Sequence, residues 1–318
     1  MNEKIENKNR VKTNSTLQSL GSLIALAGLV IIFSIISSNF RSINNILALL
    51  KQASVNALIA FGMTGVILTG GIDLSVGSTL ALTSMLCAAM VRGDIPPILA
   101  MLIVLLLGLG FGSLSGILVT KGRLQPFIAT LITMTVFRGI TMIFSNGMPM
   151  SNLGEDPFLT GIGKGTLLLI PVPVWVMIVM FALFFFVLNK TTFGRRIYAT
   201  GSNEKAARLA GVNTNKTKLI VYIASGFTAT LAGLILLSRL GSAQPTIGTG
   251  YEMDAIAAVA LGGTSMSGGR GKIYGTLIGV IIIAVLNNGL NIMNVSSYYQ
   301  DVVKGIVILL AVLSDRNR

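Results

Sequence analysis

An acidic side chain stands among glycines between two apolar stretches near residue 70. The segment runs Gly70-Gly71-Ile72-Asp73-Leu74-Ser75-Val76-Gly77-Ser78. Glycine lets the backbone turn with positive φ or approach another chain closely. An ionisable group at membrane depth usually faces the protein interior or a water-filled route. Asp73 can therefore touch a polar solute, or it can cap a half-helix through the exposed amides at the helix start, and we favour capping.

The glycine pattern returns late in the chain. Gly262-Gly263-Thr264-Ser265-Met266-Ser267-Gly268-Gly269 repeats Gly-Gly-x-x-(Leu/Met)-Ser-x-Gly. Glycine-interrupted hydrophobic segments at corresponding positions of an internal repeat point to the binding site of a transporter. In a chain with 36 glycines, two plain turns between helices would look alike. If both segments are simple turns, we expect them on the same side of the membrane.

Amide side chains gather in a late apolar stretch, where Asn287 and Asn291 share one helix face at i,i+4. A polar solute needs hydrogen-bonding partners on its way through hydrocarbon. The predicted lining of such a path comprises Asn56, Asp73, Ser75, Asn287, Asn288 and Asn291. Interhelical hydrogen bonds, each worth under about 2 kcal/mol in membranes, remain the alternative for the asparagines. Arg138 and the i,i+3 pair Asp301 and Lys304 are expected to serve structure.

The elements that must position these residues are membrane spans. The chain is 53% hydrophobic and 11% charged, with a mean hydropathy of +0.80, which excludes an ordinary soluble core. A span needs about 20 mainly apolar residues. The clear candidates are Leu20 to Ser37, Ile46 to Leu68, Pro97 to Val119, Phe127 to Ser145, Leu167 to Leu188, Leu219 to Leu237 and Ile273 to Ile292. With the marginal Leu74 to Val91, Met253 to Leu261 and Tyr298 to Leu313, we predict an all-α polytopic membrane protein of about ten spans with an internal repeat.

Charge fixes the expected orientation. The net charge of +13 would suggest a nucleic-acid partner in a soluble protein. Most of the 24 basic residues, however, fall in segments that share one side, which follows the positive-inside rule with both termini in the cytoplasm. We expect an uncleaved first span, a tail over residues 1–19, a permease domain over residues 20–313 and a short tail over residues 314–318. A bacterial cytoplasmic membrane and its lipid are the expected surroundings, with no nucleic acid.

Residue types needed for most metal and acid–base chemistry are scarce. The sequence has no histidine, and Cys87 is its one cysteine. Histidine is the commonest metal ligand and general base near neutral pH, so we predict neither a metal site nor a cofactor. An intramembrane enzyme is disfavoured for the same reason.

One long polar segment, Asn189 to Lys218, breaks the run of short connections. It carries helix signals: Asn203 as the N-cap, Glu204 in the first turn, Arg208 at i,i+4 from Glu204, and Gly211 as the stop. Ala207 belongs to a small-residue face suited to docking on a cytoplasmic protein. A basic loop that only sets topology is the alternative.

These motifs together resemble the permease subunits of bacterial ABC importers for monosaccharides. The likeness rests on Gly70 to Ser78, on Thr192 through Arg208, and on Ser242 through Gly271, and it covers nearly the whole chain. Within that family the chain is most similar to members that carry ribose, to which Phe127 to Leu131 and Leu286 to Asn291 add. Another monosaccharide is the alternative substrate.

The resemblance implies partners. It implies paired permeases, with a homodimer expected, a cytoplasmic ATP-binding subunit, and an extracytoplasmic sugar-binding protein. Residues Asn203, Glu204, Ala207, Arg208 and Gly211 would then form the coupling helix that receives the ATPase stroke. The chain itself has no nucleotide-binding glycine loop, because Gly269-Arg270-Gly271-Lys272 is followed by Ile273 rather than a hydroxyl residue. A proton-coupled secondary transporter using Asp73, Arg138 and the Asp301/Lys304 pair is the rival.

Overall fold

The computed structural model describes residues 21–154 and 156–316, with side chains up to residue 309. Its principal helices are Gly21–Ile36, α2 (Ile43–Leu68), α3 (Val76–Arg92), α4 (Pro97–Thr120), α5 (Pro126–Ser145), α7 (Val172–Lys190), α10 (Thr214–Leu240), α11 (Tyr251–Leu261), α12 (Ile273–Ile292) and α13 (Ser297–Arg316). Shorter elements are η1 (Ser38–Arg41), α6 (Pro157–Lys164), the hairpin β1 (Thr166–Leu167) and β2 (Ile170–Pro171), α8 (Thr192–Ser202) and α9 (Glu204–Leu209). Each predicted span therefore corresponds to a helix, and the chain is an all-α polytopic membrane protein.

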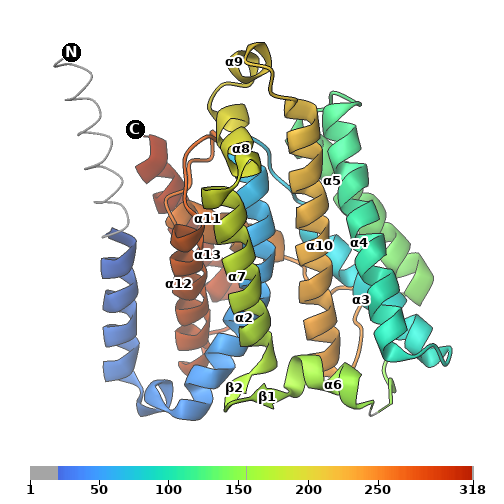
Figure 1. Cartoon of the computed structure of the whole chain (residues 1–318). Helices are drawn as coiled ribbons and strands as arrows, with labels where there is room; N and C mark the ends of the chain where they lie inside the picture. The colour runs from blue at the N-terminus through green and yellow to red at the C-terminus, as the bar shows by residue number, and fades with distance from the viewer. Residues whose placement is uncertain (1–20, 155, 317–318) are drawn as a thin grey trace.

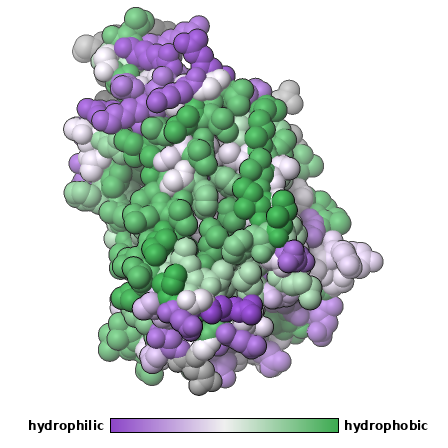
Figure 2. Space-filling view, turned by 90° about the vertical axis from the view of Figure 1, so that its right-hand side faces the viewer, coloured by the Kyte–Doolittle hydropathy of each residue, from purple (hydrophilic) through white to green (hydrophobic). Residues whose placement is uncertain are grey.

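Within the described residues, six helices are long and apolar enough to cross a membrane: α2, α4, α5, α7, α10 and α12. Apolar side chains form a belt over the face shown in Figure 2, with hydrophilic residues gathered at both ends of the molecule. We call the end that carries α8 and α9 the α9 end (Figure 1). The N-terminal helix runs away from this end, and α13 finishes near it.

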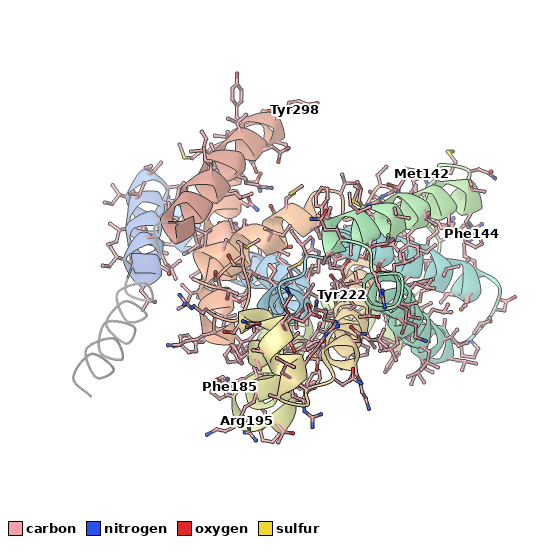
Figure 3. All side chains as sticks on the ribbon, turned by 90° about the horizontal axis from the view of Figure 1, so that it is seen from above. Met142, Phe144, Phe185, Arg195, Tyr222 and Tyr298 are labelled. Carbon is pink, nitrogen blue, oxygen red and sulfur yellow. The ribbon has the colours of Figure 1, made fainter. Side chains whose placement is uncertain are left out.

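Glycines bring α4 and α10 into close contact. A Cβ on Gly112 would come within 3.0 Å of the Ile223 Cα, and one on Gly116 within 2.8 Å of a Leu219 methyl. Small residues allow such backbone approach, which is how helices associate inside a membrane where lipid competes for apolar contact. Tyr222 of α10 is fully buried. Figure 3 places it near the centre of the bundle, whereas Tyr298, Phe144 and Phe185 stand on the rim.

One helix begins inside the bundle, and another is too short to cross a membrane. After α2 ends at the α9 end, Gly70 turns with φ of +79°, and the chain passes inward as buried, non-helical backbone before α3 starts at Val76. α11 has 11 residues, a length of roughly 16 Å, which covers about half of a 30 Å hydrocarbon layer. The Gly70 to Ser78 segment thus combines a turn with an internal helix start.

The two glycine segments lie at the same end of the bundle and touch each other, although the first is not the simple turn on which that expectation rested. The amide of Gly269 donates a hydrogen bond to the carbonyl of Leu68, at 2.9 Å. Other boundaries differ from those predicted: α8 was not anticipated, α10 begins at Thr214 rather than Leu219, and the hairpin precedes α7 where a span was expected from Leu167. The predicted tail over residues 1–19 lies outside the described residues.

Candidate functional site

Asp73 is 1% exposed and both of its carboxylate oxygens accept hydrogen bonds. Oδ1 accepts from the amide of Ser75 at 3.0 Å and from the Ser75 hydroxyl at 2.6 Å. Oδ2 accepts from the hydroxyl of Ser225 on α10 at 2.7 Å. Because Ser75 is the N-cap residue of α3, the carboxylate supports the start of that helix. The capping interpretation of Asp73 stays a prediction, because the amide that bonds it belongs to Ser75, which precedes the first helical residue, Val76.

Hydroxyl groups continue from Asp73 across the bundle. The Ser75 hydroxyl lies 3.4 Å from that of Ser115 on α4, which lies 3.0 Å from that of Thr133 on α5. The non-helical backbone before α3 is also hydrogen-bonded to a side chain, since the Tyr222 hydroxyl donates to the carbonyl of Ile72 at 3.1 Å. These bonds satisfy polar groups that would otherwise be costly at membrane depth.

A second polar region surrounds the first turn of α11, which contains Glu252 and Asp254. Acidic side chains are favoured there because the free amides of a helix N-terminus carry partial positive charge. Arg138 of α5 attracts Glu252 electrostatically. Its guanidinium donates hydrogen bonds to the carbonyls of Pro245, at 2.6 Å, and Ile247, at 3.0 Å. Arg138 therefore holds the chain that leads into α11.

On the other flank of α11, Lys304 of α13 forms an ion pair with Asp254, with Nζ 3.3 Å from Oδ1. Lys304 also lies 3.6 Å from Asp301, so the predicted i,i+3 pair is present but shares its lysine. The side chains of Lys304 and Asp254 are 22% and 9% exposed, and that of Asp301 is 75% exposed. The three charges link α11 to α13.

Asn287 of α12 completes this charged region. Its side chain interacts with the carboxyl group of Asp254. It is 4% exposed, and its carbonyl oxygen Oδ1 has no hydrogen-bond partner within the described part of the chain. A buried acceptor without a partner is unusual in a native protein, so this oxygen is available to a donor such as a solute hydroxyl.

The other predicted path residues point in different directions. Asn288 exchanges two hydrogen bonds of 2.9 Å with Asn45 of α2. Asn291 accepts from Gln300 of α13 at 2.8 Å. Asn56 is buried within α2. The structure thus brings Asp73 and Ser75 together, whereas the three asparagines of α12 face three separate helices.

Sequence reasoning did not place Glu252 and Asp254 in the site. The signal was available, because both acids open an apolar run that is too short to cross a membrane unaided. A short apolar helix with acids in its first turn indicates a start at depth, where carboxylates need partners. Within the described residues, no group of three or more histidine, cysteine or acidic side chains could hold a metal ion.

The predicted helix at residue 203 is present as α9. Asn203 caps it by accepting from the amide of Ala206 at 2.9 Å, and Gly211 ends it with φ of +82°. Glu204 pairs with Arg208 at 2.8 Å and with Lys218 of α10 at 2.6 Å. The small-residue face is split, because Ala207 is buried while Ala206 and Ala210 are exposed.

The charge balance at α9 favours ionised Glu204. Partial burial raises the pKa of the Glu204 carboxyl, but the hydrogen bond and the charge of Lys218, with bonds from Arg208 and Thr214, lower it further. The net pKa lies below its ordinary value. The carboxylate therefore ties α9 to the start of α10, which braces a helix too short to be stable alone.

At the end of the bundle opposite α9, two loops meet. Met150 and Ala243 exchange two backbone hydrogen bonds of 2.8 Å, and the hydroxyl of Ser238 donates to the carbonyl of Leu159. A cleft of about 840 Å³ opens there, lined by Asn152, Leu153, Gly154, Leu159, Thr160, Lys164, Leu237, Ser238 and Gly241.

Comparison with known proteins gives a consistent result. The family described as "Branched-chain amino acid transport system / permease component" matches residues 45–312. The chain is 53% identical to the ribose import permease protein RbsC of Bacillus subtilis (strain 168), over 97% of this chain and 96% of that protein. It is 52% identical to the RbsC of Escherichia coli (strain K12), over 97% of both chains. The D-allose transport system permease protein AlsC of E. coli is 40% identical over 93% of this chain and 91% of its own length. No solved structure was found to match the chain.

Proposed function

Since this chain belongs to the permease family described as "Branched-chain amino acid transport system / permease component", we propose that it is the membrane subunit of an ATP-driven importer that carries D-ribose. The observation that supports D-ribose as the substrate is the 53% identity to a ribose import permease over 97% of the chain. Identity falls to 40% for the D-allose permease and 36% for the L-arabinose permease. Another monosaccharide carried by the same mechanism is the second candidate.

The sugar path runs beside the first turn of α11. Each hydroxyl of a pentose costs a few kcal/mol to bury without a partner, and this region offers the carboxylates of Glu252 and Asp254. Among the six path residues proposed from the sequence, Asn287 fits best, because its buried oxygen lacks a donor. Asp73 and Ser75 support α3 in this conformation. Asn56, Asn288 and Asn291 brace the surrounding helices.

A second copy of the chain closes the path. Asp301 is exposed on α13, and the same helix presents Tyr298, Val302, Ile306 and Leu309 outward. A charged side chain that faces lipid is costly, whereas a facing protein surface supplies polar partners and buries the apolar residues. A homodimer that covers α13 meets both needs.

A cytoplasmic ATP-binding subunit binds α9. Leu209, at the tip, is 91% exposed, and a large apolar side chain standing alone on a charged segment is suited to a pocket on a partner. Asn203, Glu204, Ala207, Arg208 and Gly211 set the shape and bracing of this coupling helix. The α9 end is then cytoplasmic, and we expect both termini on that side of a multi-pass protein of the bacterial cytoplasmic membrane.

The opposite end receives the extracytoplasmic sugar-binding protein. By resemblance to the importer family, the loops Ser145 to Gly165 and Gly241 to Glu252 would face that protein, and they are joined through Met150 and Ala243 beside the cleft. The chain itself supplies no catalytic residues, and ATP is hydrolysed by the separate subunit.

The test is uptake of labelled D-ribose in a bacterial strain whose own ribose permease is deleted. We expect this chain to restore uptake, and unlabelled D-ribose to compete better than D-allose or L-arabinose. Glu204→Lys, which reverses the charge facing Lys218, and Gly211→Val, which strains a positive φ, should abolish uptake while membrane insertion persists. Normal import in both variants would contradict the coupling role of α9, and absence of any ribose uptake by the wild type would contradict the substrate.

A further inference from the structure

The last turn of α8 meets both glycine segments at one point. A Cβ on Gly201 would collide with the carbonyl oxygen of Leu68 and would lie 2.6 Å from the amide nitrogen of Gly269. That same amide donates to the Leu68 carbonyl. Leu68 ends α2 just before the first glycine segment, and Gly269 belongs to the second. Three backbones therefore touch with no side chain between them.

Neighbouring contacts confirm that the junction is made by backbone. A Cβ on Gly268 would lie 2.8 Å from the nitrogen of Gly70, and one on Gly269 would lie 2.6 Å from the Cα of Ser202. Gly70, Gly268 and Gly269 all have positive φ, which residues with a side chain rarely adopt. The hydroxyl of Tyr198 on α8 adds a 3.0 Å hydrogen bond to the carbonyl of Gly271.

The junction stands between α9 and the membrane interior. Only Asn203 separates α8 from α9, and the Asn203 amide donates back to the carbonyl of Ala199, at 3.2 Å. Beyond Gly70 the chain enters the bundle at Asp73, and beyond Gly271 it begins α12, which carries Asn287. Closely packed backbone has no rotamers that could absorb a displacement, so a shift of α9 reaches both internal segments.

We propose that Gly201 is the positioning residue through which movement of the coupling helix passes to both halves of the permease. This inference rests on the proposed function, because it needs an ATPase that moves α9. The inference gives the two glycine segments a mechanical role. Both segments move when the ATPase moves α9, and the polar regions at Asp73 and at α11 respond together.

The test uses the complete complex of this chain, its ATP-binding subunit and its ribose-binding protein in proteoliposomes. The readout is the number of ATP molecules hydrolysed per ribose moved, which a merely structural role would leave unchanged in correctly assembled complex. Gly201→Ala introduces the collision with Leu68. Tyr198→Phe removes only the hydrogen bond to Gly271 and keeps the ring. Gly110→Ala on α4 is the matched control, because a Cβ there meets nothing within 4 Å.

We expect the ATP-to-ribose ratio to rise by about 2- to 30-fold in the two junction variants, with the larger effect for Gly201→Ala, and to stay at the wild-type value for Gly110→Ala. If the Gly201→Ala complex fails to assemble, the ATP-to-ribose ratio of Tyr198→Phe tests the proposal. A wild-type ratio in every assembled junction variant overturns the role of Gly201 while leaving the importer intact. A wild-type complex that moves no ribose on ATP addition refutes the proposed function itself, and the inference with it.

Discussion

Replacing Lys304 by glutamine removes the cation that faces the buried carboxylate of Asp254. The two groups are 3.3 Å apart, and their side chains are 22% and 9% exposed. Loss of one partner of a buried ion pair costs about 3–5 kcal/mol, and the partial exposure of Lys304 favours the lower end. A cost of about 3 kcal/mol lowers the ratio of folded to unfolded protein roughly 100-fold. It should lower the melting temperature by about 6–12 °C.

Adding Asp254→Asn to Lys304→Gln should restore the stability that Lys304→Gln loses. In Asp254→Asn/Lys304→Gln no charge remains to be compensated, and neutral replacement of a buried pair is often close to neutral in stability. The melting temperature of the detergent-purified double variant should therefore return to within a few degrees of the wild type. Asp301→Asn is the control, since its 75% exposed side chain contributes under about 1 kcal/mol.

Two outcomes would refute this reasoning. If Lys304→Gln has the same melting temperature as the wild type, the ion pair does not stabilise the packing of α11 against α13. If the double variant melts as low as Lys304→Gln, the loss of stability does not come from an unpaired Asp254 carboxylate.

Three further predictions concern single contacts. Glu204→Gln should cost about 1 kcal/mol of folding stability at pH 7 after allowance for solvent screening. Because the pKa of Glu204 is lowered in the folded protein, its contribution to stability is present above its unfolded pKa of about 4.3 and is lost as the pH falls through the lower folded value. The melting temperatures of variant and wild type should therefore converge in acid. Leu209→Asp should reduce co-purification of the ATP-binding subunit by about tenfold or more without changing the melting temperature of the isolated permease, and unchanged co-purification would exclude Leu209 as an anchor. Asn288→Ala should destabilise the protein by about 1–2 kcal/mol, and Asn45→Ala/Asn288→Ala should cost little more than either single variant in a thermal-melt cycle; additive losses would show that the two amides act independently.

Local signals in the sequence predicted the parts of the fold that depend on neighbouring residues. The apolar stretches gave the positions of the membrane helices, and Asn203, Glu204 and Gly211 identified α9 because a cap, a first-turn acid and a stop are read within one short segment. The sequence placed both glycine segments at one end only if both were simple turns, and the internal start of α3 means that counting spans could not decide this. These features rest on hydrophobicity and backbone conformation, which a short window of residues determines.

Features that depend on distant partners were not predictable. Asn287 and Asn291 share a helix face by spacing, yet one meets Asp254 and the other Gln300, because α11 and α13 both pack on that side of α12. The extent of α8 was missed because Gly194 and Gly201 weaken its helical pattern, while burial of Ile197 stabilises it. Lys304 was paired with its sequence neighbour, and the more buried partner, Asp254, lies on another helix.

ATP-driven import is tested by ribose accumulation in sealed proteoliposomes that hold this chain, its ATP-binding subunit and a ribose-loaded binding protein. We expect accumulation that requires ATP and both partners and that persists when an uncoupler dissipates the proton gradient. Accumulation by this chain alone, driven by a proton gradient and abolished by the uncoupler, would contradict it.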